Sequence, residues 1–128
     1  MKEKTLEWIA LAEEDLGAAG LMLREGLYRA CIFHCQQAIE KLLKAIWVES
    51  AAAGYPPREH NLTLLAEMAD VELSKEQASF FDALSKQYMP ARYADIAIDE
   101  KVEYSPEQAD NYYRQTVSEF QWLRRQLS

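Results

Sequence analysis

The sequence predicts an all-α protein that folds as an up-and-down bundle of four long helices and one short helix. Gly and Pro, which interrupt helices, are scarce, with four of each among 128 residues. Three of the Pro fall in apparent loops, and Pro106 stands where a helix opens. Between these points apolar residues recur at spacings of three and four, the helical period. The apolar content of 49% supports a globular chain, so we expect residues 1–128 to form one domain.

The first helix is predicted over residues 5–25. Its apolar positions form one face: Trp8, Ile9, Ala12, Leu16, Ala19 and Leu23. Gly26 suits the position after a helix end, where a left-handed backbone is common. Because only Gly26 and Leu27 separate this helix from the next, the two are expected to form an antiparallel hairpin.

The central helix is predicted over residues 28–53, a stretch without Gly or Pro. Its broad apolar face consists of Tyr28, Cys31, Ile32, Cys35, Ala38, Ile39, Leu42, Leu43 and Ile46. The opposite side mixes polar and apolar residues: Gln37, Glu40, Lys41, Lys44, Ala30, Phe33 and Val48. A helix of this kind usually touches more than one neighbour, so we expect the mixed side to be partly buried at a helix or subunit contact. The spacing of Glu40 and Lys44 predicts an ion pair between successive turns.

A short third helix is predicted over residues 61–69, after a turn-rich loop at 54–60. Asn61 or His60 is expected to cap its start. Its inward residues are predicted to be Leu62, Leu65 and Met68. Ser74 and Gln77 fit a capping box that starts the fourth helix at residue 75, and a Pro at position 90 ends it. The apolar face of this helix is Phe81, Leu84 and Tyr88.

The last helix is predicted over residues 106–126. Ser105 at the N-cap, Pro106 at the first position and Gln108 at the third form the clearest helix start in the chain. Its inner face is predicted to be Ala109, Tyr112, Tyr113, Thr116, Phe120, Leu123 and Leu127. Trp122 lies off that face. Residues 90–104 have no clear period and are expected to form an ordered loop.

The net charge and the first residues of the sequence argue against several classes of function. A net charge of −7 argues against a broad nucleic-acid surface, which requires clustered positive charge. No apolar run is long enough to predict a membrane span. Acidic residues lie near the start of the chain, where a signal peptide needs an uninterrupted apolar stretch. The chain also holds two Cys. We therefore expect a cytoplasmic protein.

A zinc site is not predicted, although Cys31, His34 and Cys35 are close in sequence. A structural zinc site needs four ligands, and His60 is the single further His or Cys in the sequence. Both Cys also lie on the apolar face of the central helix, where a free Cys packs as a small apolar residue. We expect no metal and no cofactor.

The segment FHCQQAIEKLLKA resembles the signature of HEPN domains. The shared residues in this segment are Gln37-Ala38, Glu40-Lys41 and Lys44-Ala45. Further matches cover nearly the whole chain: Trp8, Ala12, Asp15-Leu16, His60-Asn61-Leu62 and Pro90-Ala91-Arg92-Tyr93. HEPN domains are small helical bundles, so the resemblance implies the fold that the helical periods predict.

Arg92, Tyr93 and Asp95 form a candidate ligand- or partner-binding site. Spacing alone favours a structural role, in which Arg92 pairs with Asp95 or caps a helix C-terminus. The alternative is that its guanidinium binds phosphate while Tyr93 stacks on a base. HEPN domains tend to carry Arg at this place, which favours the second interpretation. In HEPN ribonucleases this Arg begins an R-x4–6-H motif. Here no His follows at that spacing, because the positions hold Ala97, Ile98 and Asp99.

Arg29 and His34 do match that spacing, but within the central helix. Residues five apart on a helix diverge by about 140°, so we interpret this match as chance. His60 is then the remaining candidate for a general base near Arg92, and it belongs to a different family motif. We therefore expect that the protein is not an enzyme.

The resemblance implies a non-catalytic HEPN protein that binds nucleotide, partners a minimal nucleotidyltransferase, or does both, within a toxin-antitoxin-like two-gene module. The site residues are predicted to be Arg92, Tyr93, Asp95, Gln37, Lys41 and Lys44. One alternative is a metal-independent HEPN ribonuclease with a degenerate or displaced site. Another is a module that only dimerises. A homodimer is expected in each case, with contacts at Phe33, Val48 and Trp122, which lie outside the core-facing stripes of their helices.

Overall fold

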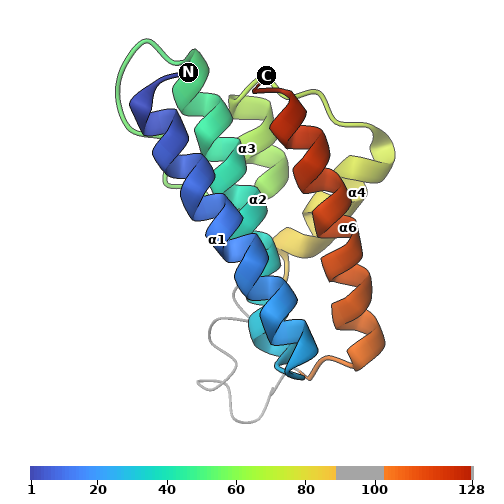
Figure 1. The fold of residues 1–128 in the computed structure, drawn as a ribbon. Helices are drawn as coiled ribbons and strands as arrows, with labels where there is room; N and C mark the ends of the chain where they lie inside the picture. Colours follow the sequence, from blue (N-terminus) through green and yellow to red (C-terminus); the bar gives the residue numbers. More distant parts are fainter. Residues whose placement is uncertain (89–102, 128) are drawn as a thin grey trace.

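The structure, a computed structural model, describes residues 1–88 and 103–127 of the chain. All regular structure in these residues is helical (Figure 1). The helices are α1 (Glu3–Arg24), α2 (Tyr28–Ser50), α3 (Leu62–Met68), α4 (Lys75–Ser85) and α6 (Pro106–Arg125). The predicted all-α bundle is confirmed. Among the described residues, no helix combines the length and the apolar character needed to cross a membrane.

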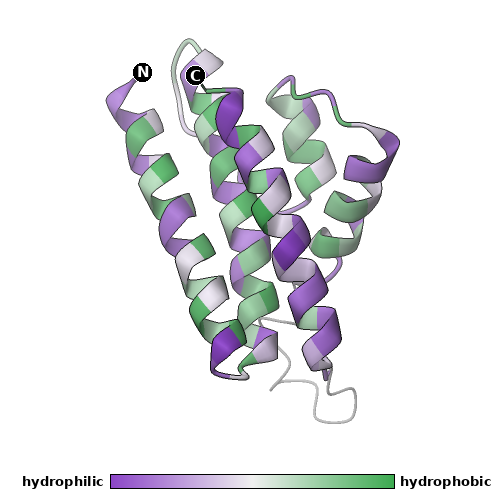
Figure 2. Cartoon of the chain, turned by 45° about the vertical axis from the view of Figure 1, so that its right-hand side comes forward, coloured by the Kyte–Doolittle hydropathy of each residue, from purple (hydrophilic) through white to green (hydrophobic). Residues whose placement is uncertain are grey.

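Helix α2 is the centre of the bundle. It contacts each of the other four helices named above, and α1 and α6 pack along its length (Figure 1). Its apolar face is buried as predicted, except that Tyr28 is only half-buried. Figure 2 shows apolar and polar residues alternating around the long helices, so the apolar faces can meet in one core.

The hairpin between α1 and α2 is made by the predicted glycine. Gly26 has a φ of 75°, which L-residues with side chains rarely adopt. The Gly26 N–H donates to Leu23 O at 3.2 Å, and the Leu27 N–H donates to Met22 O at 2.8 Å. These two bonds form a Schellman motif that satisfies the last carbonyls of α1 and turns the chain back along it.

The predicted capping residues of α3, α4 and α6 are confirmed, whereas α1 begins at Glu3, two residues before its predicted start. Asn61 caps α3 by accepting from the Leu64 N–H. Complete capping boxes start α4, between Ser74 and Gln77, and α6, between Ser105 and Gln108. Each capping side chain satisfies an N–H group that has no partner inside its helix.

Helices α2 and α4 end at least three residues before their predicted ends, and the other helices end within one residue of theirs. Helix α2 stops at Ser50, and Lys2 Nζ donates to Val48 O and Ala51 O, so a side chain from outside the helix satisfies carbonyls at its end. Helix α4 stops at Ser85 and has 11 residues, so it is shorter than the other predicted long helices. The Ser85 hydroxyl accepts from the Leu62 N–H at 2.8 Å and joins the end of α4 to the start of α3.

The predicted inward role of Met68 in α3 is wrong, since this residue is 42% exposed. Spacings of three and four from Leu62 lead to Leu65, Ala66 and Ala69, and all of these are buried. Met68 falls to the side of that stripe. A period count that favoured large residues missed the two alanines.

Candidate functional site

The polar side of α2 holds two groups of buried or half-buried charges. The first joins α2 to α1 through Asp15. His34 Nδ1 lies 2.8 Å from Asp15 Oδ1, and Lys41 Nζ donates to Asp15 Oδ2. Burial by itself raises the pKa of Asp15, but the hydrogen bonds with His34 and Lys41 outweigh burial and hold the pKa below its ordinary value. Asp15 therefore stays a carboxylate under physiological conditions.

The second group is centred on Glu40, whose side chain is 5% exposed. Glu40 Oε2 accepts from Lys44 Nζ at 3.0 Å. Glu40 Oε1 lies 2.9 Å from His60 Nδ1 and accepts from Gln36 Nε2 at 3.1 Å. The same Gln36 amide donates to His60 O at 2.9 Å. These bonds hold the segment before α3 against α2, and they supply the partners that a buried carboxylate requires.

Side chains of α2 and an aromatic cluster connect the two groups. Gln37 Nε2 donates to Gln36 Oε1 at 2.7 Å. The His60 ring stacks on Tyr88, with centroids 4.3 Å apart and planes at 14°. Phe33 lies next to both Tyr88, at 6.2 Å, and His34, at 5.4 Å. The polar residues and these rings form a continuous layer along one side of α2, and we call it the polar layer.

The structure agrees in part with the predicted role of the mixed side of α2. Lys44 is buried and Gln37 and Lys41 are half-buried, so partial burial at a helix contact is confirmed. The predicted pair between Glu40 and Lys44 is also present. Whether Gln37, Lys41 and Lys44 bind a ligand or partner stays a prediction. Arg92, Tyr93 and Asp95 lie outside the described residues, so their predicted role also stays a prediction.

The side chain of Val48 does not have the exposure expected of a dimer contact. It is 8% exposed in the single chain. Phe33 and Trp122 are half-buried, and Trp122 packs against the core although it lies off the inner stripe of α6. None of the three offers the large exposed surface that their sequence positions suggested. Their part in a dimer contact stays a prediction.

From the sequence, Asp15 stands out only as a family match, Gln36 has no predicted role, and His34 has no predicted partner. A signal existed for Asp15, which follows Ala12 by three positions and so falls on the apolar stripe of α1. An acid at a core-facing position predicts a buried carboxylate that must have partners elsewhere. No comparable signal identifies those partners, because His34 and Lys41 belong to another helix.

Both cysteines lie on the apolar face of α2, where they are buried and unoxidised. The contact with Cys31 and burial raise the pKa of the Cys35 thiol. No cluster of three or more His, Cys, Asp or Glu in the described part of the chain is arranged to hold a metal ion. Cys31 and Cys35 therefore act as packing residues between α2 and α6.

Comparison with known proteins gives the family. No curated protein matches the sequence significantly. The crystal structure of TT1696 from Thermus thermophilus is similar to this fold, with a TM-score of 0.81 over 97% of this chain and 98% of that one. The two sequences are 21% identical, so this likeness concerns the fold alone. The family model of the HEPN domain matches residues 5–124. That match includes all of α2, α3 and α4 and nearly all of α1 and α6, and the chain belongs to the HEPN domain family.

Proposed function

We propose that this HEPN protein binds a nucleotide in the cytoplasm, that it partners a minimal nucleotidyltransferase, and that it does not itself cleave RNA. The observation that carries nucleotide binding is the pair of oriented lysines in the polar layer. Lys41 and Lys44 lie one turn apart on α2, and a carboxylate holds each of them. Both ammonium groups are therefore fixed before a ligand arrives, which lowers the entropic cost of binding.

Each lysine retains donors for a ligand. An ammonium group has three N–H donors. Within the described residues, Lys41 uses one on Asp15 and Lys44 uses one on Glu40. The side chains are 25% and 10% exposed, so the remaining donors lie near the surface in a partly desolvated setting. Phosphate oxygens are suitable acceptors for such donors.

The histidines support the non-catalytic part of the proposal. The sequence contains two, His34 and His60, and each directs Nδ1 to a carboxylate that also binds a lysine. Both rings thus take part in contacts between elements of the bundle. Cleavage of RNA without a metal requires a general base beside the group that stabilises the phosphate. The sequence supplies no His at the family spacing after Arg92.

Two measurements on the purified protein test the proposal. Isothermal titration with AMP, ADP, ATP and GTP is expected to show saturable binding of at least one nucleotide. A gel assay with structured and single-stranded RNA is expected to show no products for the wild type or for Arg92→Ala. Cleavage by the wild type that is lost in Arg92→Ala would establish the ribonuclease alternative. If none of the four nucleotides binds, the proposal that the ligand is a nucleotide is refuted.

The partner and the oligomeric state have separate tests. Co-expression with a small nucleotidyltransferase encoded in the adjacent reading frame is expected to give a complex that co-purifies. We also propose a homodimer, the commonest symmetric assembly. Light scattering at tens of micromolar should then return twice the chain mass of 14.8 kDa. A mass of one chain would exclude the homodimer at that concentration.

A further inference from the structure

A cleft lies beside the end of α2 that carries Lys44. It consists of two adjoining pockets of about 340 Å³ each, which share Trp8, Tyr55 and Pro56. Its walls come from α1, from α2 and from the segment 54–58 that follows α2. Each pocket has the size of small-molecule sites in proteins.

The charge of the cleft is opposite to that of the chain. Lys4, Lys44 and Arg58 line it, and its described lining includes no acidic residue, although the chain has a net charge of −7. Lys4 pairs with a neighbouring glutamate of α1, and Lys44 pairs with Glu40. Arg58 is exposed and forms no ion pair within the described residues. A concave surface with this charge attracts an anion, and a guanidinium can bind phosphate through two parallel hydrogen bonds.

The cleft also presents two aromatic rings. Trp8 is half-buried, and Lys44 Nζ lies 5.8 Å from its ring centroid, within cation–π range. Tyr55 is 90% exposed, so the structure of the chain gives its ring little to pack against. Two prolines follow Tyr55 and restrict the backbone that carries it. An exposed ring on a restrained segment beside a cationic pocket is suited to stack on an aromatic ligand.

We infer that this cleft binds a nucleoside phosphate, with the base against Trp8 and Tyr55 and the phosphate against Arg58 and Lys44, which line the same pocket as the two rings. The inference rests on the nucleotide binding proposed above and gives it a location. A ligand that is both aromatic and anionic uses the rings and the cations together. Inorganic phosphate or a free nucleoside uses only one of them, so each alone should bind more weakly than the nucleotide.

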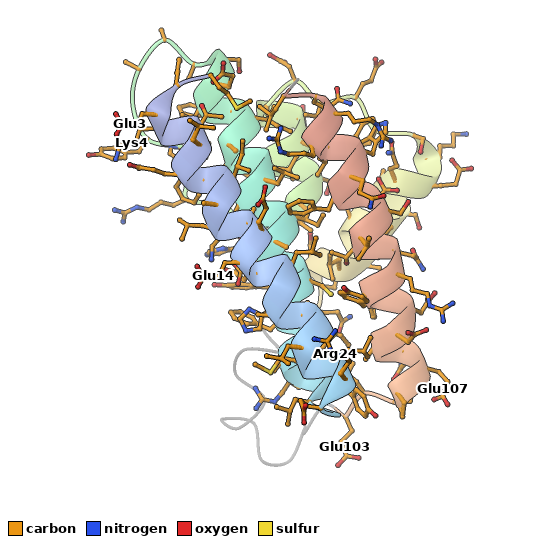
Figure 3. All side chains as sticks on the ribbon, in the orientation of Figure 1. Glu3, Lys4, Glu14, Arg24, Glu103 and Glu107 are labelled. Carbon is orange, nitrogen blue, oxygen red and sulfur yellow. The ribbon has the colours of Figure 1, made fainter. Side chains whose placement is uncertain are left out.

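The test is isothermal titration of the full chain with AMP, ADP and ATP, using variants of the two exposed residues. Arg58→Ala and Tyr55→Ala are each expected to raise the Kd about tenfold or more. Tyr55→Phe keeps the ring and should stay within about twofold of the wild type. Arg24→Ala is the matched control, because Arg24 is exposed and lies at the opposite end of α1 from Lys4 (Figure 3). Unliganded melting temperatures equal to the wild type show that the variants are folded.

The outcomes distinguish a wrong location of the site from a protein that does not bind nucleotides at all. If nucleotides bind the wild type, Arg58→Ala and Tyr55→Ala with the same Kd, the cleft is not the site, while nucleotide binding stands. If the wild type binds none of the nucleotides, both the proposed ligand and this site are refuted. Weaker binding in Arg58→Ala and Tyr55→Ala, with Tyr55→Phe and Arg24→Ala unchanged, supports the cleft.

Discussion

The two sides of α2 are both buried, but different interactions bury them. The apolar side has residues without any exposed surface: Cys31, Ile32, Cys35, Ala38, Ile39, Leu42 and Leu43. The polar layer buries Glu40 and Lys44 against α1 and against the segment before α3. Apolar burial is non-directional and follows the area removed from water. A buried charge, in contrast, is tolerated only where partners meet it. We therefore expect the apolar side to supply most of the stability and the polar layer to fix which elements lie beside α2.

The largest expected effect tests the polar layer. Glu40→Ala removes the acceptor for Lys44, His60 and Gln36, and it leaves the Lys44 ammonium buried without its counter-charge. The free energy of unfolding should fall by about 3–5 kcal/mol, measured from urea denaturation midpoints. Glu14→Ala is the control, since Glu14 is exposed on α1 and should change stability by less than about 0.5 kcal/mol.

A loss below about 1 kcal/mol in Glu40→Ala would mean that Lys44 reaches water once its partner is gone. The polar layer would then be a surface feature, and the contrast between the two sides of α2 would disappear. Glu40→Gln sharpens the result. It keeps an acceptor of the same shape, so the difference between Gln and Ala separates the lost charge from the lost hydrogen bonds.

The next effect tests the apolar side. Leu42 has no exposed surface, and Leu42→Ala should cost about 2–5 kcal/mol through lost burial and the cavity that remains. The same substitution at Leu11, which is exposed on α1, should cost far less. Equal denaturation midpoints for Leu42→Ala and Leu11→Ala would contradict the central position of α2.

The same contrast explains what the sequence could predict. The burial of Leu42 and Ala38 can be predicted from periodicity, because all residues of an apolar stripe indicate the same buried face. One residue that departs from the pattern does not change the prediction. Capping pairs such as Ser105 and Gln108 are equally local, since both partners lie within one turn. The fold class and the helix starts depend on signals of this kind.

The polar layer could be predicted only in part, because its partners come from different elements. The spacing of Glu40 and Lys44 predicts their pair, but not that His60 also binds the same carboxylate. A single sequence does not indicate which helices lie side by side, so it could not join Asp15 to His34. The cleft lined by Trp8 and Arg58 was missed for the same reason.

The smallest expected effect concerns Asp15, the residue of α1 that contacts the polar layer, and it is measured as the pH dependence of stability. The pKa of Asp15 is held below its ordinary value by His34 and Lys41, against the effect of burial. Below the ordinary Asp pKa of about 3.9, the unfolded chain therefore binds a proton that the folded chain does not. The contribution of Asp15 to stability is present above that pH and is lost as the pH falls through the lower folded pKa. Asp15→Asn removes this contribution at every pH.

At pH 7 the wild type should be more stable than Asp15→Asn by about 1–3 kcal/mol, because the substitution removes the charge that His34 and Lys41 meet. Urea denaturation at pH 5, 4 and 3 should show that the difference between the two proteins is nearly the same at pH 5 and pH 4 and is smaller at pH 3. Comparing the two proteins at each pH cancels the titration of the other carboxylates. Asp82→Asn is the control, because the Asp82 pair with Lys86 is exposed and worth little at any pH. A difference between the wild type and Asp15→Asn that stayed constant to pH 3 would show that Asp15 contributes by its shape and hydrogen bonds rather than by its charge.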